Sequence, residues 1–186
     1  PIERPCIVLR QLREEKRFSY ENISKGLRLI IFGLFIKMVV ADNIGYYVDL
    51  IYEAPNKYNS WDIILGMFLY SFQIYGDFFG YSTIALGSAK LIGYDITNNF
   101  NTPYLAKSIA DFWHRWHISL STWFRDYVYF PLGGSRVKFS RWAFNIMVVF
   151  VISGIWHGAA WNFLIWGAAH GLLHILEKAI LKHIPQ

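Results

Sequence analysis

Long apolar stretches separated by short polar or basic segments make up most of the chain. Leu27 to Val40 is strongly apolar, although Arg28 lies near its start and Lys37 breaks it, and together with Ile44 to Tyr52 it is long enough for one membrane span. The polar pair Asp42 and Asn43 lies between these stretches and predicts a kink or a polar lining there.

The next apolar stretch is expected to form two half-helices. Trp61 to Tyr75 is the first, Gly76 and Asp77 interrupt it, and Phe78 to Tyr94 is the second, rich in the small residues that allow close helix packing in lipid. Asp is favoured at helix N-termini, so we expect Asp77 to cap the second half-helix. Lining a cavity is the alternative role for its carboxylate.

An aromatic amphipathic segment and an apolar hairpin follow. Ser108 to Tyr129 is the amphipathic segment, and the positive-inside rule places the basic loop Ser135 to Arg141 in the cytoplasm. Trp142 to Trp156 would span about 22 Å at 1.5 Å per residue, less than a hydrocarbon core of about 30 Å. Because Trp161 to Leu176 then returns as a second apolar run, we predict a short hairpin with His157 near its tip, within the membrane thickness.

Composition also indicates a membrane protein. Hydrophobic residues make up 54% of the chain, and charged residues make up 17%, against the roughly 25% usual in soluble domains. The net charge of +5 does not indicate a nucleic-acid partner, because the basic residues flank apolar segments. Cys6 is the single cysteine, which excludes an internal disulfide. Residues 1–25 are predicted to be a basic cytoplasmic or interfacial segment, with a solvated helix as an equal alternative.

Histidines within two tryptophan-rich motifs, residues 108–134 and 153–171, are the candidates for chemistry. His157 lies between Trp156 and Gly158 and has no cationic neighbour in sequence, so in a buried position it would be an uncharged general base. A histidine hydrogen-bonded inside a helix bundle is the structural alternative.

The remaining histidines give weaker indications of a metal or a cofactor. His114 and His117 are three residues apart and would share one helix face, but no third ligand accompanies them. His170 and His174 are four apart on one apolar helix, a spacing that suits haem or a metal pair, although packing is the favoured role because carboxylate partners are missing.

A polar strip that begins at His117 is the last candidate, and on an aromatic helix it could line a channel. The alternative is an interfacial amphipathic helix with a local Arg125–Asp126 ion pair. The strip comprises Ser119, Ser121, Thr122, Arg125 and Asp126. Neither a glycine-rich phosphate loop nor a nucleophile elbow occurs in the sequence, which disfavours a serine hydrolase.

Two long segments resemble the membrane-bound O-acyltransferase family, and its alginate O-acetyltransferase branch in particular. They read GDFFGYSTIALGSAKLIGYDITNNFNTPYLAKSIADFWHRWHISLSTWFRDYVYFPLGG and SGIWHGAAWNFLIWGAAHG, and the opening PIERP is similar to the same branch. The resemblance implies an all-α, polytopic membrane helix bundle with short or re-entrant helices around a tunnel. Residues 1–186 are expected to be an internal fragment of one such domain.

The resemblance also implies a reaction and a site. His157 matches the family's catalytic histidine and His117 its second histidine, whereas His114 has no counterpart there. Seven further residues are candidates for contact with substrate or tunnel: Trp116, Ser119, Trp123, Arg125, Asp126, Trp156 and Trp161.

The implied donor is a cytoplasmic thioester, either acetyl-CoA or an acyl carrier protein, and no bound cofactor or metal is expected. The acceptor would be a hydroxyl of an extracellular polysaccharide, or a partner acyltransferase outside the membrane. The implied location is the bacterial cytoplasmic membrane. A glycan transporter with a histidine proton relay, and a haem or metal membrane protein built on His170 and His174, are the alternative functions.

Overall fold

The computed structural model describes residues 1–17 and 19–182, and within them all regular structure is helical. The chain divides into two compact units, one comprising Pro1 and Glu3–Asn99 and the other comprising Ile2 and Phe100–Gln186. In the described part of the chain, three helices are long and apolar enough to cross a membrane. The all-α membrane helix bundle predicted from the sequence is therefore confirmed.

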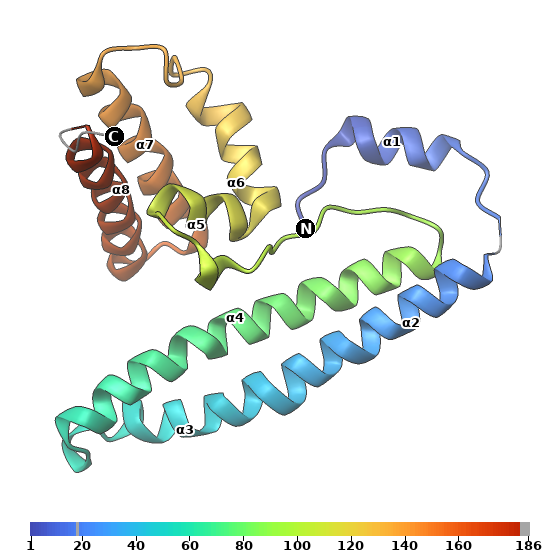
Figure 1. Cartoon of the computed structure of the whole chain (residues 1–186), viewed down its shortest axis with the longest axis horizontal. Coiled ribbons are helices and arrows are strands. Elements are labelled where there is room, and N and C mark those ends of the chain that lie inside the picture. The colour runs from blue at the N-terminus through green and yellow to red at the C-terminus, as the bar shows by residue number, and fades with distance from the viewer. Residues whose placement is uncertain (18, 183–186) are drawn as a thin grey trace. The chain divides into compact units, whose positions relative to one another are not determined.

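The first unit is dominated by a long antiparallel helical hairpin (Figure 1). One arm is an unbroken helical run whose middle segment is a π-helix, and the other arm is a single helix. The elements of this unit are α1 (Pro5–Arg13), α2 (Tyr20–Leu34), η1 (the π-helix Phe35–Ala41), α3 (Asp42–Glu53), η2 (Pro55–Lys57) and α4 (Ser60–Leu91).

Glycines hold the two arms of this hairpin together. A Cβ atom added to Gly26 would lie 2.7 Å from the carbonyl oxygen of Gly87, and one added to Gly33 would lie 2.7 Å from that of Gly80. Such distances are too short for any side chain, so the backbones are in direct contact, as small residues permit in membrane helices. Gly80 and Gly87, two of the small residues expected to allow close packing, have this role.

The π-helix keeps this contact in register. The buried positions Gly26, Gly33, Ala41 and Val48 follow one another at intervals of 7, 8 and 7 residues. A seven-residue interval nearly matches two helical turns, so positions seven apart lie on the same face of a regular helix. In a regular helix, the extra residue between Gly33 and Ala41 would turn Ala41 and Val48 away from α4. The wide π-turn absorbs that extra residue.

The predicted break at Asp77 is wrong. Helix α4 is continuous from Ser60 to Leu91, and the Asp77 carboxylate lies mid-helix, 2.7 Å from the Nζ atom of Lys37. Lys37 also pairs with Asp42. The carboxylate therefore bridges the two arms instead of capping a helix, and the irregularity predicted at Asp42 and Asn43 lies just before them, in η1.

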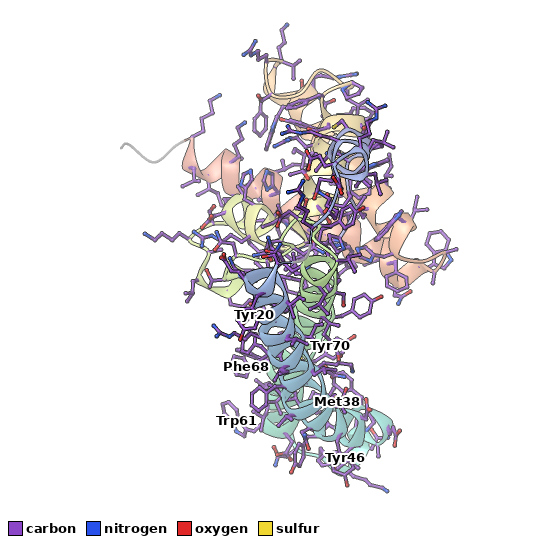
Figure 2. The ribbon with its side chains drawn as sticks, turned by 90° about the vertical axis from the view of Figure 1, so that its right-hand side faces the viewer. Tyr20, Met38, Tyr46, Trp61, Phe68 and Tyr70 are labelled. Atoms are coloured by element: carbon purple, nitrogen blue, oxygen red, sulfur yellow. The ribbon has the colours of Figure 1, made fainter. Side chains whose placement is uncertain are left out.

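The outside of the hairpin carries large apolar side chains, and Figure 2 labels six of them: Tyr20, Met38, Tyr46, Trp61, Phe68 and Tyr70. All six are exposed in the described chain. An apolar exterior of this extent is unusual for a soluble monomer and suits contact with lipid or with other membrane helices.

The second unit consists of a helical hairpin with shorter helices before it. Its elements are η3 (Pro103–Leu105), α5 (Ile109–Arg115), α6 (Ile118–Phe124), η4 (the π-helix Arg125–Tyr129), α7 (Phe139–His157) and α8 (Trp161–Leu181). The single amphipathic helix expected over Ser108 to Tyr129 is thus divided into three short elements.

Helices α7 and α8 pack against each other through glycines. A Cβ atom at Gly154 would lie 2.4 Å from the carbonyl oxygen of Phe163, and one at Gly167 would lie 2.3 Å from that of Phe150. Helix α7 has 19 residues because it begins at Phe139, so it extends about 28 Å. The expected length of about 22 Å was too short, and α7 approaches the thickness of a hydrocarbon core.

Candidate active site

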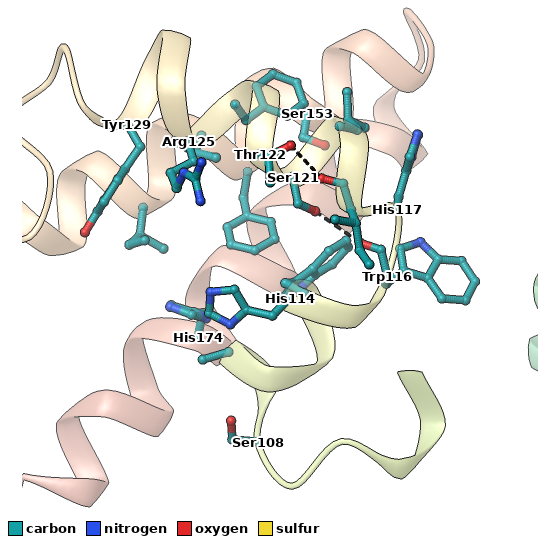
Figure 3. A pocket seen from close by; sticks show the side chains of 18 of the residues that line it. Ser108, His114, Trp116, His117, Ser121, Thr122, Arg125, Tyr129, Ser153 and His174 are labelled. Atoms are coloured by element: carbon teal, nitrogen blue, oxygen red, sulfur yellow. Dashed lines mark hydrogen bonds between the residues drawn. The ribbon is translucent and has the colours of Figure 1, made fainter. Parts of the chain in front are cut away.

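The second unit contains a cavity of about 490 Å³, which falls in the range of small-molecule sites (Figure 3). Its lining comes from α5, α6, η4, α7 and α8. Helix α7 contributes residues at intervals of three or four positions, apart from the adjacent pair Val149 and Phe150. These residues are Trp142, Ile146, Val149, Phe150, Ser153 and His157. One face of α7 therefore forms a continuous wall of the cavity.

His117 enters the cavity from a strained position between two helices. Helix α5 ends at Arg115, Trp116 is extended, and His117 has a left-handed backbone with φ of 45°. A non-glycine residue with positive φ is uncommon and is often found at functional sites. The carbonyl oxygen of His117 accepts the first α6 hydrogen bond, from the N–H of Ser121 at 2.9 Å.

This break corrects the expected relation between His114 and His117. Because the helix ends between them, the two imidazoles do not share one helix face, and the geometry assumed for a metal pair does not exist. Among the described residues, no group of three or more His, Cys, Asp or Glu side chains is arranged to hold a metal ion.

The imidazole of His117 is buried, with 7% of the residue exposed. Burial lowers its pKa to about 4, and the nearby His157 acts in the same direction. At neutral pH His117 is therefore an uncharged imidazole, which offers one N–H donor and one nitrogen lone pair.

His157 ends α7, and aromatic rings fix the position of its imidazole. Its centroid lies 5.0 Å from the ring of Trp156 and 5.1 Å from that of Trp166, both edge-on, and it stacks on Phe163 at 6.5 Å. Gly158 makes the stacking possible, since a Cβ atom there would lie 2.5 Å from a ring carbon of Phe163.

His157 is exposed in the described chain, whereas the sequence predicted a buried residue. It stands at the end of α7, where few neighbouring side chains cover it. The ring of Trp156 connects the two candidate histidines, because it lies 6.3 Å from that of His117 and also contacts His157. Two imidazoles from positions 40 residues apart in sequence thus line one cavity.

Hydroxyl groups in the cavity wall mainly support the backbone. Ser121 donates a hydrogen bond to the carbonyl oxygen of Trp116 at 3.1 Å, and Thr122 donates to that of Ile118 at 2.8 Å, as Figure 3 shows in part. Arg125 lines the cavity while its Nε atom donates to Asp126 at 2.8 Å. The local ion pair considered in the sequence analysis is therefore present.

The structure brings four of the nine candidate site residues to the cavity wall: Trp116, His117, Arg125 and His157. Five others lie outside the described lining: Ser119, Trp123, Asp126, Trp156 and Trp161. Ser119 is buried and accepts a hydrogen bond from the N–H of Ile2, and Trp161 is 78% exposed. Trp156 retains a role through its ring contacts with both histidines.

Several lining residues were not among the candidates for an acyl-transfer site. His114, set aside because it has no counterpart in the family motif, lines the cavity, as do Ser153, His174 and Glu177. His170 instead packs among Trp113, Phe150 and Trp166. The regular spacing of residues along α7 was the one signal that could have identified Ser153.

Comparison with known proteins identifies relatives that are acyltransferases by name. The chain is 39% identical over 181 residues to the peptidoglycan O-acetyltransferase of Helicobacter pylori, covering 96% of this chain and 34% of that protein. It is 37% identical over 184 residues to the probable alginate O-acetylase AlgI of Azotobacter vinelandii, covering 96% and 36%. The teichoic acid D-alanyltransferase of Bacillus subtilis is 35% identical over 172 residues, covering 86% and 43%.

The chain therefore spans about a third of the length of the first two relatives. The model of the MBOAT family matches residues 8–186, which is nearly the whole chain. Together with the helical architecture and the paired histidines, this match shows that the chain belongs to the membrane-bound O-acyltransferase family.

Proposed function

We propose that the full-length protein transfers an acyl group, most simply acetyl, from a thioester to a hydroxyl of a cell-surface polysaccharide. The relatives are by name O-acetyltransferases, O-acetylases and D-alanyltransferases. The observation that carries the proposal is the presence of His117 and His157 in one cavity, with His117 held in a strained backbone conformation.

His157 is the general base in this reaction. Its imidazole takes the proton of the acceptor hydroxyl while the oxygen attacks the thioester carbonyl carbon. A C–O bond forms, the C–S bond breaks, and the departing sulfur receives the proton from the imidazolium. Proton transfer by a positioned group of this kind typically contributes about 10²–10⁴-fold to the rate.

His117 is assigned to the carbonyl oxygen of the thioester. An uncharged imidazole can donate its N–H to the negative charge that develops on this oxygen during the attack. Its burial restricts reorientation of the ring during the reaction. The rings of Trp156, Phe163 and Trp166 contact His157 but leave it exposed, so in the full-length protein other helices would exclude the water that would otherwise hydrolyse the thioester.

Charge distribution supports a cytoplasmic donor. The sequence from Trp142 to Leu176 contains no Asp, Glu, Lys or Arg. Basic residues occur at the other end of the α7–α8 hairpin from His157, namely Arg136, Lys138, Arg141, Lys178 and Lys182. By the positive-inside rule this end faces the cytoplasm. A thioester such as acetyl-CoA or an acyl carrier protein would enter there, in the cytoplasmic membrane of a bacterium, and the polysaccharide would receive the acyl group outside.

Replacing His157 tests this proposal. Membranes containing the full-length protein are supplied with radiolabelled acetyl donor and polysaccharide acceptor, and label in the polymer is measured. We expect His157→Ala to reduce transfer by at least about 100-fold without lowering the yield of folded protein. His170→Phe is the matched control, because it removes an imidazole on the adjoining helix and keeps an aromatic ring there.

Retained transfer in His157→Ala would exclude this residue as the base. Label that crosses the membrane without becoming attached to the polymer would instead support a transporter.

A further inference from the structure

Helix α1 lies at the surface of the first unit, and none of its residues is buried in the described part of the chain. Its apolar residues follow the helical repeat and lie on one side of the helix. They form the α1 stripe, which comprises Pro5, Val8, Leu9 and Leu12. Because Leu9 is 53% exposed and Leu12 is 57% exposed, the described residues leave this apolar face largely uncovered.

Hydrogen bonds on another side of α1 fix the direction in which the stripe faces. Gln11 lies about 160° around the helix axis from Leu9. Its side-chain amide pairs with the backbone of Asp95, donating to the carbonyl oxygen at 2.7 Å and accepting from the N–H at 2.8 Å. The carboxylate of Glu3 accepts a hydrogen bond from the N–H of Thr97. Helix α1 is therefore attached to the segment that follows α4, and the stripe takes no part in this attachment.

As a membrane span, α4 places its C-terminal end at the membrane surface. The helix has 32 residues and extends about 48 Å at 1.5 Å per residue. The hydrocarbon core is about 30 Å thick, and the bilayer with its headgroup regions measures about 40–45 Å. Asp95 follows four residues after the helix ends at Leu91, so the attached α1 lies at the level of the headgroups.

The distribution of charge assigns this end of the first hairpin to the cytoplasm. Residues 1–28 contain seven Lys and Arg against four acidic residues, whereas residues 49–62, at the opposite end, contain one Lys against three acidic residues. By the positive-inside rule, the end that carries α1 faces the cytoplasm. The cytoplasmic leaflet has a negative surface potential from its anionic lipids, which attracts basic segments close to the membrane.

Two arginines of α1 differ in their position relative to the stripe. Arg13 is exposed and lies about 40° from Leu9 around the helix axis, at the edge of the stripe. Arg10 lies about 100° from Leu9, and its Nε atom is 3.7 Å from the carboxylate of Glu14. Arginine can lay its stem along an apolar surface and present its guanidinium to a phosphate, so Arg13 is placed for this contact and Arg10 is not.

We propose that α1 lies in the surface of the cytoplasmic leaflet, with the α1 stripe at the boundary between headgroups and acyl chains and Arg13 on the phosphate of an anionic phospholipid. Amphipathic helices with basic residues beside an apolar face bind membranes in this way. The apolar stripe at headgroup level favours lipid over an acidic soluble protein as the partner. Of the two interpretations left open for residues 1–25, this proposal adopts the interfacial segment, and the anchoring role is independent of acyl transfer.

Fluorescence quenching by brominated lipids tests both the depth of α1 and the lipid beside it. Full-length protein with Leu9→Cys carries a bimane fluorophore at this position, and its other cysteines, Cys6 included, are replaced by serine. The protein is placed in nanodiscs of phosphatidylcholine with one fifth phosphatidylglycerol. Either the phosphatidylglycerol or an equal amount of phosphatidylcholine is brominated in its acyl chains. Glu14→Cys, on the far side of the helix, provides the matched label position.

We expect the label at position 9 to be quenched by both brominated lipids and the label at position 14 to be quenched weakly by either. At position 9, phosphatidylglycerol should quench about fivefold more strongly than phosphatidylcholine, the effect of one basic residue near an anionic surface. Arg13→Gln should remove most of this preference. Arg10→Gln is the matched control, because it removes the same charge from the same helix away from the stripe, and it should keep most of the preference.

Three results would overturn the proposal. A label at position 9 that is quenched no more than the label at position 14 would place the stripe in water or beneath another protein segment. Equal quenching by the two brominated lipids would exclude a preference for anionic phospholipid. An equal loss of preference in Arg10→Gln and Arg13→Gln would show a general effect of net charge instead of a contact at the edge of the stripe.

Discussion

The α2–α4 hairpin and the α7–α8 hairpin share one kind of helix contact but use their other surfaces differently. Glycines bring the backbones together in both. Both hairpins carry large exposed apolar side chains, but in the second a face of α7 is also left unpacked and lines a cavity. Close packing is enough to make a stable helix pair, but a site needs a face that packing leaves open.

Adding one methyl group at the glycine contacts is the strongest test of the shared feature. We expect Gly87→Ala and Gly154→Ala to reduce the folded yield sharply, because the new Cβ atom would lie 2.6 Å and 2.4 Å from a backbone oxygen. Overpacking of this kind costs about 1–3 kcal/mol or more. Gly66→Ala is the control, since its Cβ atom would meet only side-chain atoms of Ile51, at 3.2 Å or more, and no backbone oxygen. Thermal unfolding in detergent measures all three.

If Gly154→Ala folded as well as Gly66→Ala and lost only activity, the two hairpins would not share the same kind of contact.

A smaller effect is expected from His117→Asn, which is specific to the second unit. Asn tolerates the left-handed backbone, so folding should be kept. Transfer should fall by about 100-fold, because the shorter Asn side chain does not place its N–H where the imidazole N–H lies. Acid stability gives a second readout. Folded His117 has a pKa of about 4, and the unfolded chain has one of about 6.5, so acidification from pH 6.5 towards 4 protonates the unfolded chain first and lowers the free energy of unfolding.

The Asn variant lacks this component and should therefore lose less thermal stability than wild type between pH 7 and pH 4.5. An identical loss in both proteins would contradict the burial of an uncharged imidazole at this position.

The smallest effects on activity are expected at Trp156 and Trp161, which the sequence analysis assigned to the same group of candidates. Trp156→Ala removes the ring that contacts both histidines and should reduce kcat several-fold. Trp161→Ala should leave kcat unchanged and alter stability by less than about 0.5 kcal/mol, because Trp161 is 78% exposed and lies outside the described lining. Equal losses of kcat in the two variants would show that the wall around His157 extends to the start of α8.

Much of the helical fold was predictable from the sequence, because apolar runs of this length have few other solutions in a membrane protein. The small residues of α4 correctly indicated close packing. Asp77 was misassigned because its local preference for a helix N-terminus was overridden by a distant partner, Lys37. Such a pairing depends on the register of two helices and is not visible in either one alone.

The site was only partly predictable for a related reason. The spacing of His114 and His117 implies a common face only if the helix continues, and no Gly or Pro marks the break at Trp116. Family resemblance supplied His117 and His157, whereas their meeting in one cavity depends on how α6 packs near α7.

The wide turn at Phe35–Ala41 affects how related sequences should be compared. Because the π-helix accommodates one extra residue, the buried positions of both α2 and α3 face α4. The same extra residue in a regular helix would rotate α3 by about 100° about the helix axis. Homologues can thus gain or lose one position in this stretch without loss of the fold. If a homologue differs by one residue in this stretch, an alignment without a gap would match exposed positions of its α3 to the buried positions of this one.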